Sequence, residues 1–376
     1  MQNNNKNNMH IAHIIEPMEH GVFIWVVDMA NRLVEEGYRV SVLHSIREHT
    51  PKNWRDMFDE RVELIHVQMT RSIDPVMDIK ALLGLVKNLK HLSPDIIHTH
   101  SSKGGFLARV AGFLLRKNKR LLYTSHAIHY PLIQEPIKRK LYKYFEHIGY
   151  WLGGTIVACG KEEYEIIRKD ITNGSGKRLI RISNGIDTAQ LTPKDYSIKN
   201  EKIKIGVVGR ISLQKAPWVF AEIAGKINKT RDDVEFIWIG GGEDDDVKML
   251  SEAGVIITGM LDRGDALKLI PSLDIYFQTS AYEGLSLALL EAQASGIPAV
   301  VTKIPGNDEV VQHGETGYVG EDEEKLTAFL ISLVDSEADR QKMGEYAKQH
   351  TEEYFSLSAM TDQYKDEYQK MVSAES

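Results

Sequence analysis

The strongest constraint on the fold is a regular alternation of short β-branched runs with longer amphipathic patterns. The amphipathic patterns, such as VFIWVVDMANRLVEEG at 22–37 and WVFAEIAGKINK at 218–229, have the apolar spacing of helices. Strands that alternate with helices in this way are typical of parallel sheets covered by helices on both faces. We therefore expect an α/β fold made of doubly wound sheets. The expected strands are 11–15, 40–43, 96–99, 121–125, 203–208, 235–239, 274–280 and 299–302.

The chain is expected to form two such domains, because its 376 residues exceed the size at which a single core usually stops growing. The sequence turns polar at 192–201 and then starts a new strand, so we expect a linker there between a first domain, 10–191, and a second, 202–355. Residues 1–9 form an asparagine-rich tail, and 356–376 form a helix that could return to the first domain. Doubly wound sheets bind ligands at the carboxyl ends of their strands, so the site is expected in a cleft between two facing domains.

Composition excludes several classes of protein. The 46 basic and 53 acidic residues give a net charge of -7, which has the wrong sign for a nucleic-acid partner. The single cysteine, Cys159, follows an apolar run and is expected to be a small buried residue. The first residues lack the apolar core of a signal peptide, and no apolar run reaches roughly 18 residues. We therefore expect a cytoplasmic protein with no membrane-spanning helix.

Several attractive motifs do not fit their patterns. NGSGKR at 173–178 lacks the glycine and the hydroxyl residue of a phosphate loop, because Ile171 and Arg178 stand in those places. The acidic run of GGGEDDD at 240–246 opens a helix, where acids complement the helix dipole. HTH at 98–100 and SHAIH at 125–129 offer four histidines, which we interpret as structural or substrate-contacting residues and not as zinc ligands. No metal site and no cofactor is expected.

The loop after the first strand argues against a nicotinamide dehydrogenase. It contains one glycine, Gly21, where the dinucleotide fingerprint needs three. Gly21 nevertheless stands where a strand gives way to a helix, and the backbone N–H groups of a helix start can bind an anion.

The second domain carries a more informative pattern. IGVVGRISLQKAPW places Arg210 and Lys215 in the loop after the domain's first strand. Two cations there could hold a diphosphate, or they could be solvated loop charges. Further along, Ser286 is expected to cap a helix from about 287 to 295, with Glu283 in the loop before it and Glu291 inside it. A buried carboxylate at Glu291 needs hydrogen-bond donors, which the hydroxyl groups of a ligand would supply.

Five motifs in order resemble one enzyme family. EGLSLALLEAQASGIPAVVT at 283–302 resembles the E-x7-E signature of retaining GT-B glycosyltransferases of the family-4 type, and GVVGRISLQK at 206–215 resembles that family's phosphate-binding segment. The resemblance covers roughly residues 10 to 355 and is greatest to bacterial capsule and exopolysaccharide enzymes. It implies two Rossmann-like domains that face each other across a cleft. The other matching stretches are TSHAIHY around the family's active-site histidine, ISNGID and GETGYV.

The resemblance also implies roles for individual residues. Glu283 would contact hydroxyls of the donor sugar and Glu291 the ribose, while Gly21 would let its loop approach the diphosphate. The chain departs from the family's usual glycines at Val22 and Ala216, which affects the expected loop shapes but not the class. The implied catalytic residues are His126, which would lie beside the transferring carbon, Glu283, Arg210 and Lys215, of which the last two would neutralise the diphosphate. The implied donor-binding residues are Gly21, Gly209, Arg210, Lys215, Gly240, Glu283, Gly284, Leu285, Ser286 and Glu291.

The implied reaction is a retaining, metal-independent transfer of a hexose or N-acetylhexosamine from a nucleotide sugar, most commonly a UDP-sugar. The acceptor would be a glycan or a lipid-linked sugar in bacterial surface polysaccharide synthesis. The alternatives are a nucleotide-sugar-binding subunit without catalysis, a sugar-nucleotide epimerase on the same fold, and a metal-dependent transferase of the other common fold.

One basic and aromatic segment leaves two interpretations open. IKRKLYKYFEHIGYW at 137–151 interleaves lysines and arginine with tyrosines, phenylalanine and tryptophan, and the basic RKNKR lies at 116–120. The segment could lie on the anionic inner face of the cell membrane, where a lipid-linked acceptor is found. Alternatively, its aromatic residues could belong to the core beneath a solvated basic face.

Overall fold

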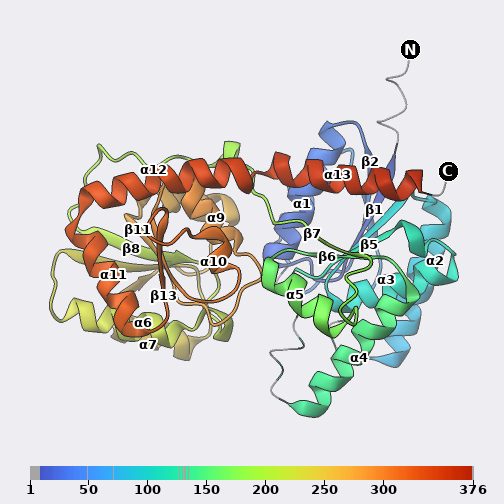
Figure 1. Cartoon of the computed structure of the whole chain (residues 1–376), viewed down its shortest axis with the longest axis horizontal. Helices are drawn as coiled ribbons and strands as arrows, with labels where there is room; N and C mark the ends of the chain where they lie inside the picture. Colours follow the sequence, from blue (N-terminus) through green and yellow to red (C-terminus); the bar gives the residue numbers. More distant parts are fainter. Residues whose placement is uncertain are drawn as a thin grey trace. The chain divides into compact units, whose positions relative to one another are not determined.

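The structure is a computed structural model that describes residues 9–374, apart from 49, 71, 127, 129, 131, 132 and 134. His129, one of the four histidines expected together, and residues 1–8 of the expected tail lie outside this described part. The chain divides into two compact units, and many of their strands and helices are labelled in Figure 1. The first unit comprises the chain up to Asn184 together with Met360–Ser376, and the second comprises Gly185–Ala359.

The first unit is built on a sheet of seven parallel strands in the order β3-β2-β1-β4-β5-β6-β7. The order reverses between β1 and β4, which pair with His13 opposite His98 and Ile15 opposite His100. Such a reversal is the switch point at which doubly wound sheets bind ligands. The strands are β1 (His10–Ile15), β2 (Arg39–His44), β3 (Glu63–His66), β4 (Ile96–His100), β5 (Leu121–Thr124), β6 (Thr155–Ala158) and β7 (Leu179–Arg181).

Helices connect these strands, and local capping explains where one of them begins. The Asp74 carboxylate accepts hydrogen bonds from the amides of Val76 and Met77, and Pro75 occupies the first helical position, where its missing N–H is not needed. The helices are α1 (His20–Glu35), α2 (Pro75–Leu92), α3 (Ser102–Leu114), α4 (Pro136–Leu152) and α5 (Lys161–Asp170), with short 3-10 turns η1 (Trp54–Met57) and η2 (Asn118–Arg120). Cys159, at the end of β6, is fully buried, as expected from the sequence.

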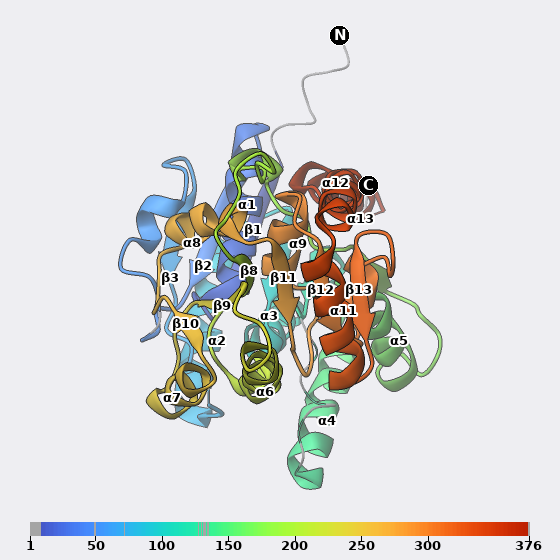
Figure 2. The ribbon, with the colours of Figure 1, turned by 90° about the vertical axis from the view of Figure 1, so that its left-hand side faces the viewer.

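The second unit repeats this plan with six parallel strands in the order β10-β9-β8-β11-β12-β13. Figure 2 shows these strands side by side, and the order reverses between β8 and β11. The doubly wound sheets expected from the sequence are therefore confirmed in both units. The strands are β8 (Ile203–Val208), β9 (Val234–Ile239), β10 (Val255–Ile257), β11 (Ile275–Gln278), β12 (Ala299–Thr302) and β13 (Gly317–Gly320).

One continuous apolar core lies between this sheet and its helices, and Phe220, Phe236, Trp238 and Phe277 are completely buried in it. The helices are α6 (Pro217–Asn228), α7 (Asp244–Glu252), α8 (Arg263–Leu269), α9 (Leu287–Ala294), α10 (Asn307–Val310), α11 (Glu323–Asp335) and α12 (Glu337–Tyr354), with 3-10 turns η4 (Thr188–Gln190), η5 (Leu213–Lys215) and η6 (Ile270–Ser272).

The polar segment 192–201 lies within the second unit. Lys194 is 3.0 Å from the Asp274 carboxylate, and the Tyr196 hydroxyl donates a 2.7 Å hydrogen bond to the carbonyl of Gly296. These contacts show that the segment packs onto the second unit through its polar side chains.

The last helix, α13 (Leu357–Ser373), belongs to the first unit from Met360 onward. Its tyrosines are buried there: Tyr368 lies 2.7 Å from His98 Nδ1, and Tyr364 lies 3.3 Å from the Thr124 hydroxyl. Two buried phenols with polar partners tie this helix to the strands β4 and β5.

Helix α4 is attached to the first unit through one buried charged network. The guanidinium of Arg109 on α3 is 2.9 Å from Glu146, and the Tyr123 hydroxyl donates a 3.1 Å hydrogen bond to the same carboxylate. Burying both charges requires this pairing. By contrast, Tyr142, Tyr144 and Trp151 are exposed. The interpretation that placed the aromatic residues of 137–151 in the core is therefore wrong for these three.

Candidate functional site

Two glycines bring the ends of β8 and β9 into close contact. Gly209 and Gly240 have φ angles of 144° and 145°, and a Cβ atom on Gly240 would lie 2.1 Å from the carbonyl oxygen of Gly209. The Trp238 indole N–H donates a 2.8 Å hydrogen bond to that same oxygen. Only glycine fits at position 240. Its close contact with Gly209 helps to hold the start of the loop that carries Arg210 and Lys215.

The loop after β8 holds Lys215 against Glu283, which follows β11. Lys215 Nζ lies 2.7 Å from Glu283 Oε1 and 3.3 Å from Gln278 Oε1. Glu283 accepts two further hydrogen bonds, from the Ser280 hydroxyl at 2.8 Å and from the Gln214 amide at 3.1 Å. The side chains of Lys215 and Glu283 are only 14% and 8% exposed. The two residues therefore form an ordered ion pair beside the switch point of the second sheet.

Helix α9 starts next to this pair, at Leu287, as its predicted cap requires. The Ser286 hydroxyl accepts the backbone N–H of Leu289 at 3.4 Å and donates to Gln278 Oε1 at 3.1 Å. Gln278 is fully buried and also donates to Asn307 at 2.8 Å. Leu285 is buried, and the backbone carbonyl of Gly284 would lie 2.5 Å from a Cβ atom on Gly306. The residues 283–286 are thus packed from several sides.

Glu291 lies inside α9, is buried, and has a protein partner that was not expected. A guanidinium nitrogen of Arg263, at the start of α8, lies 3.2 Å from Glu291 Oε1. The sequence indicated that this carboxylate needs donors, but it assigned them to a ligand. Burial strongly raises the pKa of Tyr276, and the charges of Glu283 and Glu291 add to the effect.

Arg210 is held much more loosely than Lys215. Its guanidinium is 38% exposed and lies 3.6 Å from the carboxylate of Glu243, which is itself 83% exposed. Solvent screens such a pair, so little free energy fixes the side chain of Arg210 in this position.

In the first unit, Gly21 is exposed in the first turn of α1. Glu19 occupies the N-cap position of this helix, but its side chain makes no capping hydrogen bond and lies 3.1 Å from Arg47. Arg47 also forms an ion pair with the buried Glu16. The loop between β1 and α1 is therefore fixed by charges, and the first-turn amides of α1 are not covered by the cap side chain.

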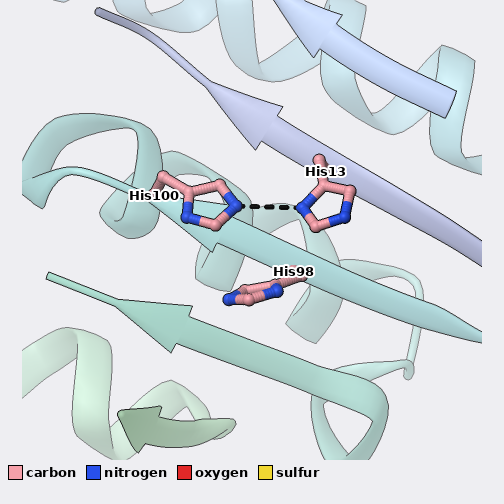
Figure 3. Close-up of side chains that lie close together, drawn as sticks. All are labelled: His13, His98 and His100. Carbon is pink, nitrogen blue, oxygen red and sulfur yellow. Dashed lines mark hydrogen bonds between the residues drawn. The ribbon is translucent and has the colours of Figure 1, made fainter. Parts of the chain in front are cut away.

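His126 belongs to a row of three hydrogen-bonded histidines: His13 lies within β1, His100 is the last residue of β4, and His126 follows β5. His100 Nδ1 lies 2.9 Å from His126 Nε2, and His100 Nε2 lies 3.0 Å from His13 Nδ1 (Figure 3). His98 lies beside them and uses both its nitrogens on hydroxyl groups, those of Tyr368 at 2.7 Å and Thr124 at 2.8 Å. The sequence did not indicate His13, which stands in a run read only as a strand.

The imidazoles of His13, His98 and His100 are buried, whereas His126 is partly exposed. Burial lowers the pKa of His13 and His126 to about 3, and it lowers the pKa of His98 and His100 well below the ordinary value. The Trp25 ring packs against His100 and His126 at centroid distances of 5.0 and 5.1 Å. These histidines are therefore neutral and suited to hydrogen bonding.

Comparison with known proteins now identifies the family. The family model "Glycosyltransferase Family 4" matches residues 20–190, and the model "Glycosyl transferases group 1" matches residues 189–350. The chain is 29% identical to a UDP-Gal:alpha-D-GlcNAc-diphosphoundecaprenol alpha-1,3-galactosyltransferase of Escherichia coli over 84% of this chain and 86% of that protein. It is 23% identical to the capsular polysaccharide biosynthesis glycosyltransferase CapM of Staphylococcus aureus, over 81% and 85% of the two chains.

The fold is shared with solved structures of low sequence identity. Anabaena Alr3699/HepE in complex with UDP and glucose superposes with a TM-score of 0.77 at 16% identity, covering 96% of this chain and 100% of that one. With the two family models spanning both units, the chain is a glycosyltransferase of the GT-B fold, with a family-4 region followed by a group-1 region.

Proposed function

We propose that this glycosyltransferase moves a hexose or N-acetylhexosamine from a UDP-sugar to a lipid-linked or glycan acceptor, with retention and without a metal ion. The observation that carries the proposal is the buried Lys215–Glu283 pair at the switch point of the second sheet, beside the start of α9. A carboxylate suited to sugar hydroxyls, an ammonium suited to a phosphate and a helix N-terminus lie close together there. A binding subunit or an epimerase could use the same groups, and the test below separates them from a transferase.

Glu283 is arranged to accept one more hydrogen bond. A carboxylate offers about four lone-pair positions. In the described structure Lys215 and Ser280 take those of Oε1 and Gln214 takes one of Oε2. One position on Oε2 remains, which suits a single hydroxyl of the donor sugar. We propose that Glu283 orients the sugar in this way and does not act as a nucleophile.

The cations would stabilise the leaving group. Lys215 uses two of its three N–H donors on Glu283 and Gln278, which leaves one for a phosphate oxygen. Arg210 is held loosely enough to turn its planar fork toward the diphosphate. Together with the N-terminus of α9, they supply positive charge where the departing UDP becomes negative. This supports a mechanism in which no metal ion has to carry that charge.

In the proposed step the bond from the sugar C1 to the diphosphate oxygen breaks. The acceptor hydroxyl oxygen forms its bond to C1 on the same face, and its proton passes to the departing phosphate oxygen. The products are the glycosylated acceptor and UDP, and the configuration at C1 is retained. His126 is neutral, so its proposed part is to hold the sugar by a hydrogen bond and not to donate a proton as an imidazolium. Glu291 would bind the ribose, with Arg263 keeping its carboxylate in place.

The acceptor is proposed to be presented at a membrane surface on the cytoplasmic side. The Escherichia coli relative acts on a sugar linked through a diphosphate to undecaprenol, as its name states. Helix α4 exposes Ile137, Tyr144 and Trp151, the last to 89%, among four basic residues of the same helix. An exposed face that mixes aromatic and basic side chains is suited to an anionic lipid surface. Among the described helices, none is both long and apolar enough to cross a membrane.

The test is incubation of the purified chain with a panel of sugar nucleotides and an undecaprenyl-diphosphate-linked sugar. We expect UDP release and a longer lipid-linked glycan with one UDP-sugar, with retained anomeric configuration by NMR and with full rate in excess chelator. Conversion of the sugar without acceptor would identify an epimerase, and tight donor binding without turnover would identify a binding subunit. Loss of activity in chelator, restored by a divalent cation, would contradict the metal-free mechanism.

A further inference from the structure

The imidazole of His126 has one nitrogen already committed inside the protein. Its Nε2 lies 2.9 Å from His100 Nδ1, and within the described structure its Nδ1 forms no hydrogen bond with the protein. The backbone at His126 has a φ of 59°, a left-handed conformation that is uncommon and strained for residues other than glycine. A strained residue with one bonded nitrogen and one available nitrogen is arranged to present Nδ1.

His13, His98 and His100 have ligand atoms that all lie within 4.8 Å of one another, which is close enough for a shared metal ion. The hydrogen bonds account for the cluster better. Both nitrogens of His98 are bonded to hydroxyls, and its ring lies over that of His100 at a centroid distance of 4.3 Å, tilted by 41°. Metal ligands instead point their nitrogens, in the plane of each ring, at a common centre.

The row of histidines couples their protonation. Each neutral imidazole carries one N–H, so the two bonds of His100 must run in the same direction along the row. Either His126 donates to His100 and His100 to His13, or His13 donates to His100 and His100 to His126. In the first arrangement His126 Nδ1 is an acceptor, and in the second it is a donor. In both, His126 Nε2 is used and the ring cannot flip without losing its bond to His100.

The row of histidines ends inside the protein at His13. His13 Nε2 is buried and has no hydrogen-bond partner within the described structure. A proton that entered at His126 would therefore find no exit at His13, so the row is unsuited to carrying protons through the domain. Its remaining use is to hold one ring in one orientation.

We propose that His100, itself held by His13, is a positioning residue that fixes the imidazole of His126 with Nδ1 turned toward the substrate. The proposal rests on the proposed function, in which His126 contacts the donor sugar. His100 makes no contact with substrate in this proposal and acts only through His126.

Two substitutions at His100 separate its two hydrogen bonds. The amide of asparagine occupies the place of an imidazole Nδ1, so His100→Asn keeps a partner for His126 and removes the one for His13. The amide of glutamine occupies the place of Nε2, so His100→Gln keeps the partner for His13 and removes the one for His126. Both variants remove the same ring, and melting temperatures control for any difference in stability.

We expect His100→Gln to lower kcat about tenfold with a smaller change in donor KM, and His100→Asn to stay within about threefold of the parent. Nitrogen-15 NMR of labelled histidine should show His126 Nε2 in a hydrogen bond in the parent and in His100→Asn, and a shifted Nε2 resonance from loss of that bond in His100→Gln. Equal effects of the two variants on kcat, with an unchanged His126 spectrum in both, would overturn the positioning role.

His126→Ala separates this inference from the proposed function. If it loses activity while the two His100 variants behave alike, the role of His126 stands and the positioning role falls. If it keeps full activity, the assignment of His126 to the donor sugar fails, and the positioning role falls with it. Stoichiometric zinc in the purified protein, lost together with activity in His100→Asn, would replace the hydrogen-bonded row with a metal site.

Discussion

The ammonium nitrogen of Lys215 lies 2.7 Å from a carboxylate oxygen of Glu283, and both side chains are largely withdrawn from solvent. The two residues come from loops after β8 and β11, the neighbouring strands at which the order of the second sheet reverses. Before any ligand binds, the structure has therefore placed the proposed sugar-binding and phosphate-binding groups in contact. Each residue holds the other in position, so neither can be changed without affecting both.

Substitution of either partner should therefore produce coupled losses. Lys215→Ala removes the proposed leaving-group stabilisation and leaves a buried carboxylate without its cation, so we expect turnover to fall by more than tenfold and stability by about 3 kcal/mol. Glu283→Gln should lower turnover with a smaller loss of stability, because the amide oxygen can still accept a hydrogen bond from Lys215. A double-mutant cycle with Ala at both positions should be clearly non-additive in urea unfolding. Additive losses would show that the contact carries no coupling.

Arg210 provides the matched case of a cation outside the buried pair. Its partner Glu243 is exposed, so Arg210→Ala should change stability by less than about 1 kcal/mol. If Arg210 neutralises the diphosphate, the same substitution lowers turnover by more than tenfold. Glu243→Gln is the control and should leave turnover close to that of the parent. Near-normal rates in Arg210→Ala would remove this residue from the proposed site.

Arg263 and Glu291 should act together on nucleotide binding. Glu291→Gln retains the size of the side chain but weakens its hydrogen bond to a ribose hydroxyl, so we expect a raised KM for the donor with a smaller change in kcat. Arg263→Met should produce a similar but smaller rise in KM by releasing the carboxylate. A donor lacking the ribose 2′ and 3′ hydroxyls should bind the parent and Glu291→Gln about equally. If Glu291→Gln still binds the normal donor much more tightly than the donor lacking these hydroxyls, the ribose contact belongs to another residue.

Local features of the site could be predicted from the sequence, and distant partners could not. The cap of α9 at Ser286 follows from neighbouring residues and was found at the expected position. The partner of Glu291 is 28 residues away, and that of His13 is 87 residues away. The apolar surroundings of a polar side chain in the sequence indicate that it needs a hydrogen-bond partner. Only the folded chain shows which residue that partner is. His126 was predicted only through the resemblance of TSHAIHY to a family motif, and no such motif covers His13.

Which residues are buried was harder to predict from the sequence than the order of the strands and helices. Segment 192–201 looks like a solvated linker because it is polar, yet Tyr196 and Lys194 bury their polar groups by pairing them on the second unit. The aromatic residues of α4 could belong either to the core or to a membrane-facing surface by sequence alone, and Trp151 is exposed. Polarity predicts burial only on average, because a paired polar group can be buried and an apolar group can be kept exposed for binding.

The buried histidines should make the first unit sensitive to acid. In the unfolded chain a histidine titrates near its ordinary pKa of 6.5, whereas folding lowers the pKa of His13 and His126 to about 3. Between these values the unfolded state binds more protons, so stability is fully present above pH 6.5 and falls as the pH drops below it. Near pH 5.5 the loss is about 1.4 kcal/mol for each such histidine.

Urea unfolding at several pH values measures this effect. His13→Phe should show a weaker loss between neutral and acid pH than the parent, because it removes one of the titrating groups. The exposed His91, changed to Gln, is the control and should leave the slope unchanged. The nearby phenols of Tyr364 and Tyr368 do not interfere, because burial raises their pKa well above the ordinary value. A stability that is flat from neutral pH to about 5 would contradict the neutral state of the row.

Helix α4 should bind anionic membranes through its exposed residues. Trp151→Ala and Ile137→Ser remove apolar side chains that contact no core, so they should leave the melting temperature unchanged while weakening sedimentation with liposomes. Lys138→Gln together with Lys140→Gln should weaken binding only to liposomes that contain anionic lipid. Glu146→Gln is the structural control, because it disturbs the buried pair with Arg109 and should lower the melting temperature instead. Equal sedimentation of the parent and the surface variants would show that α4 is not the membrane-facing element.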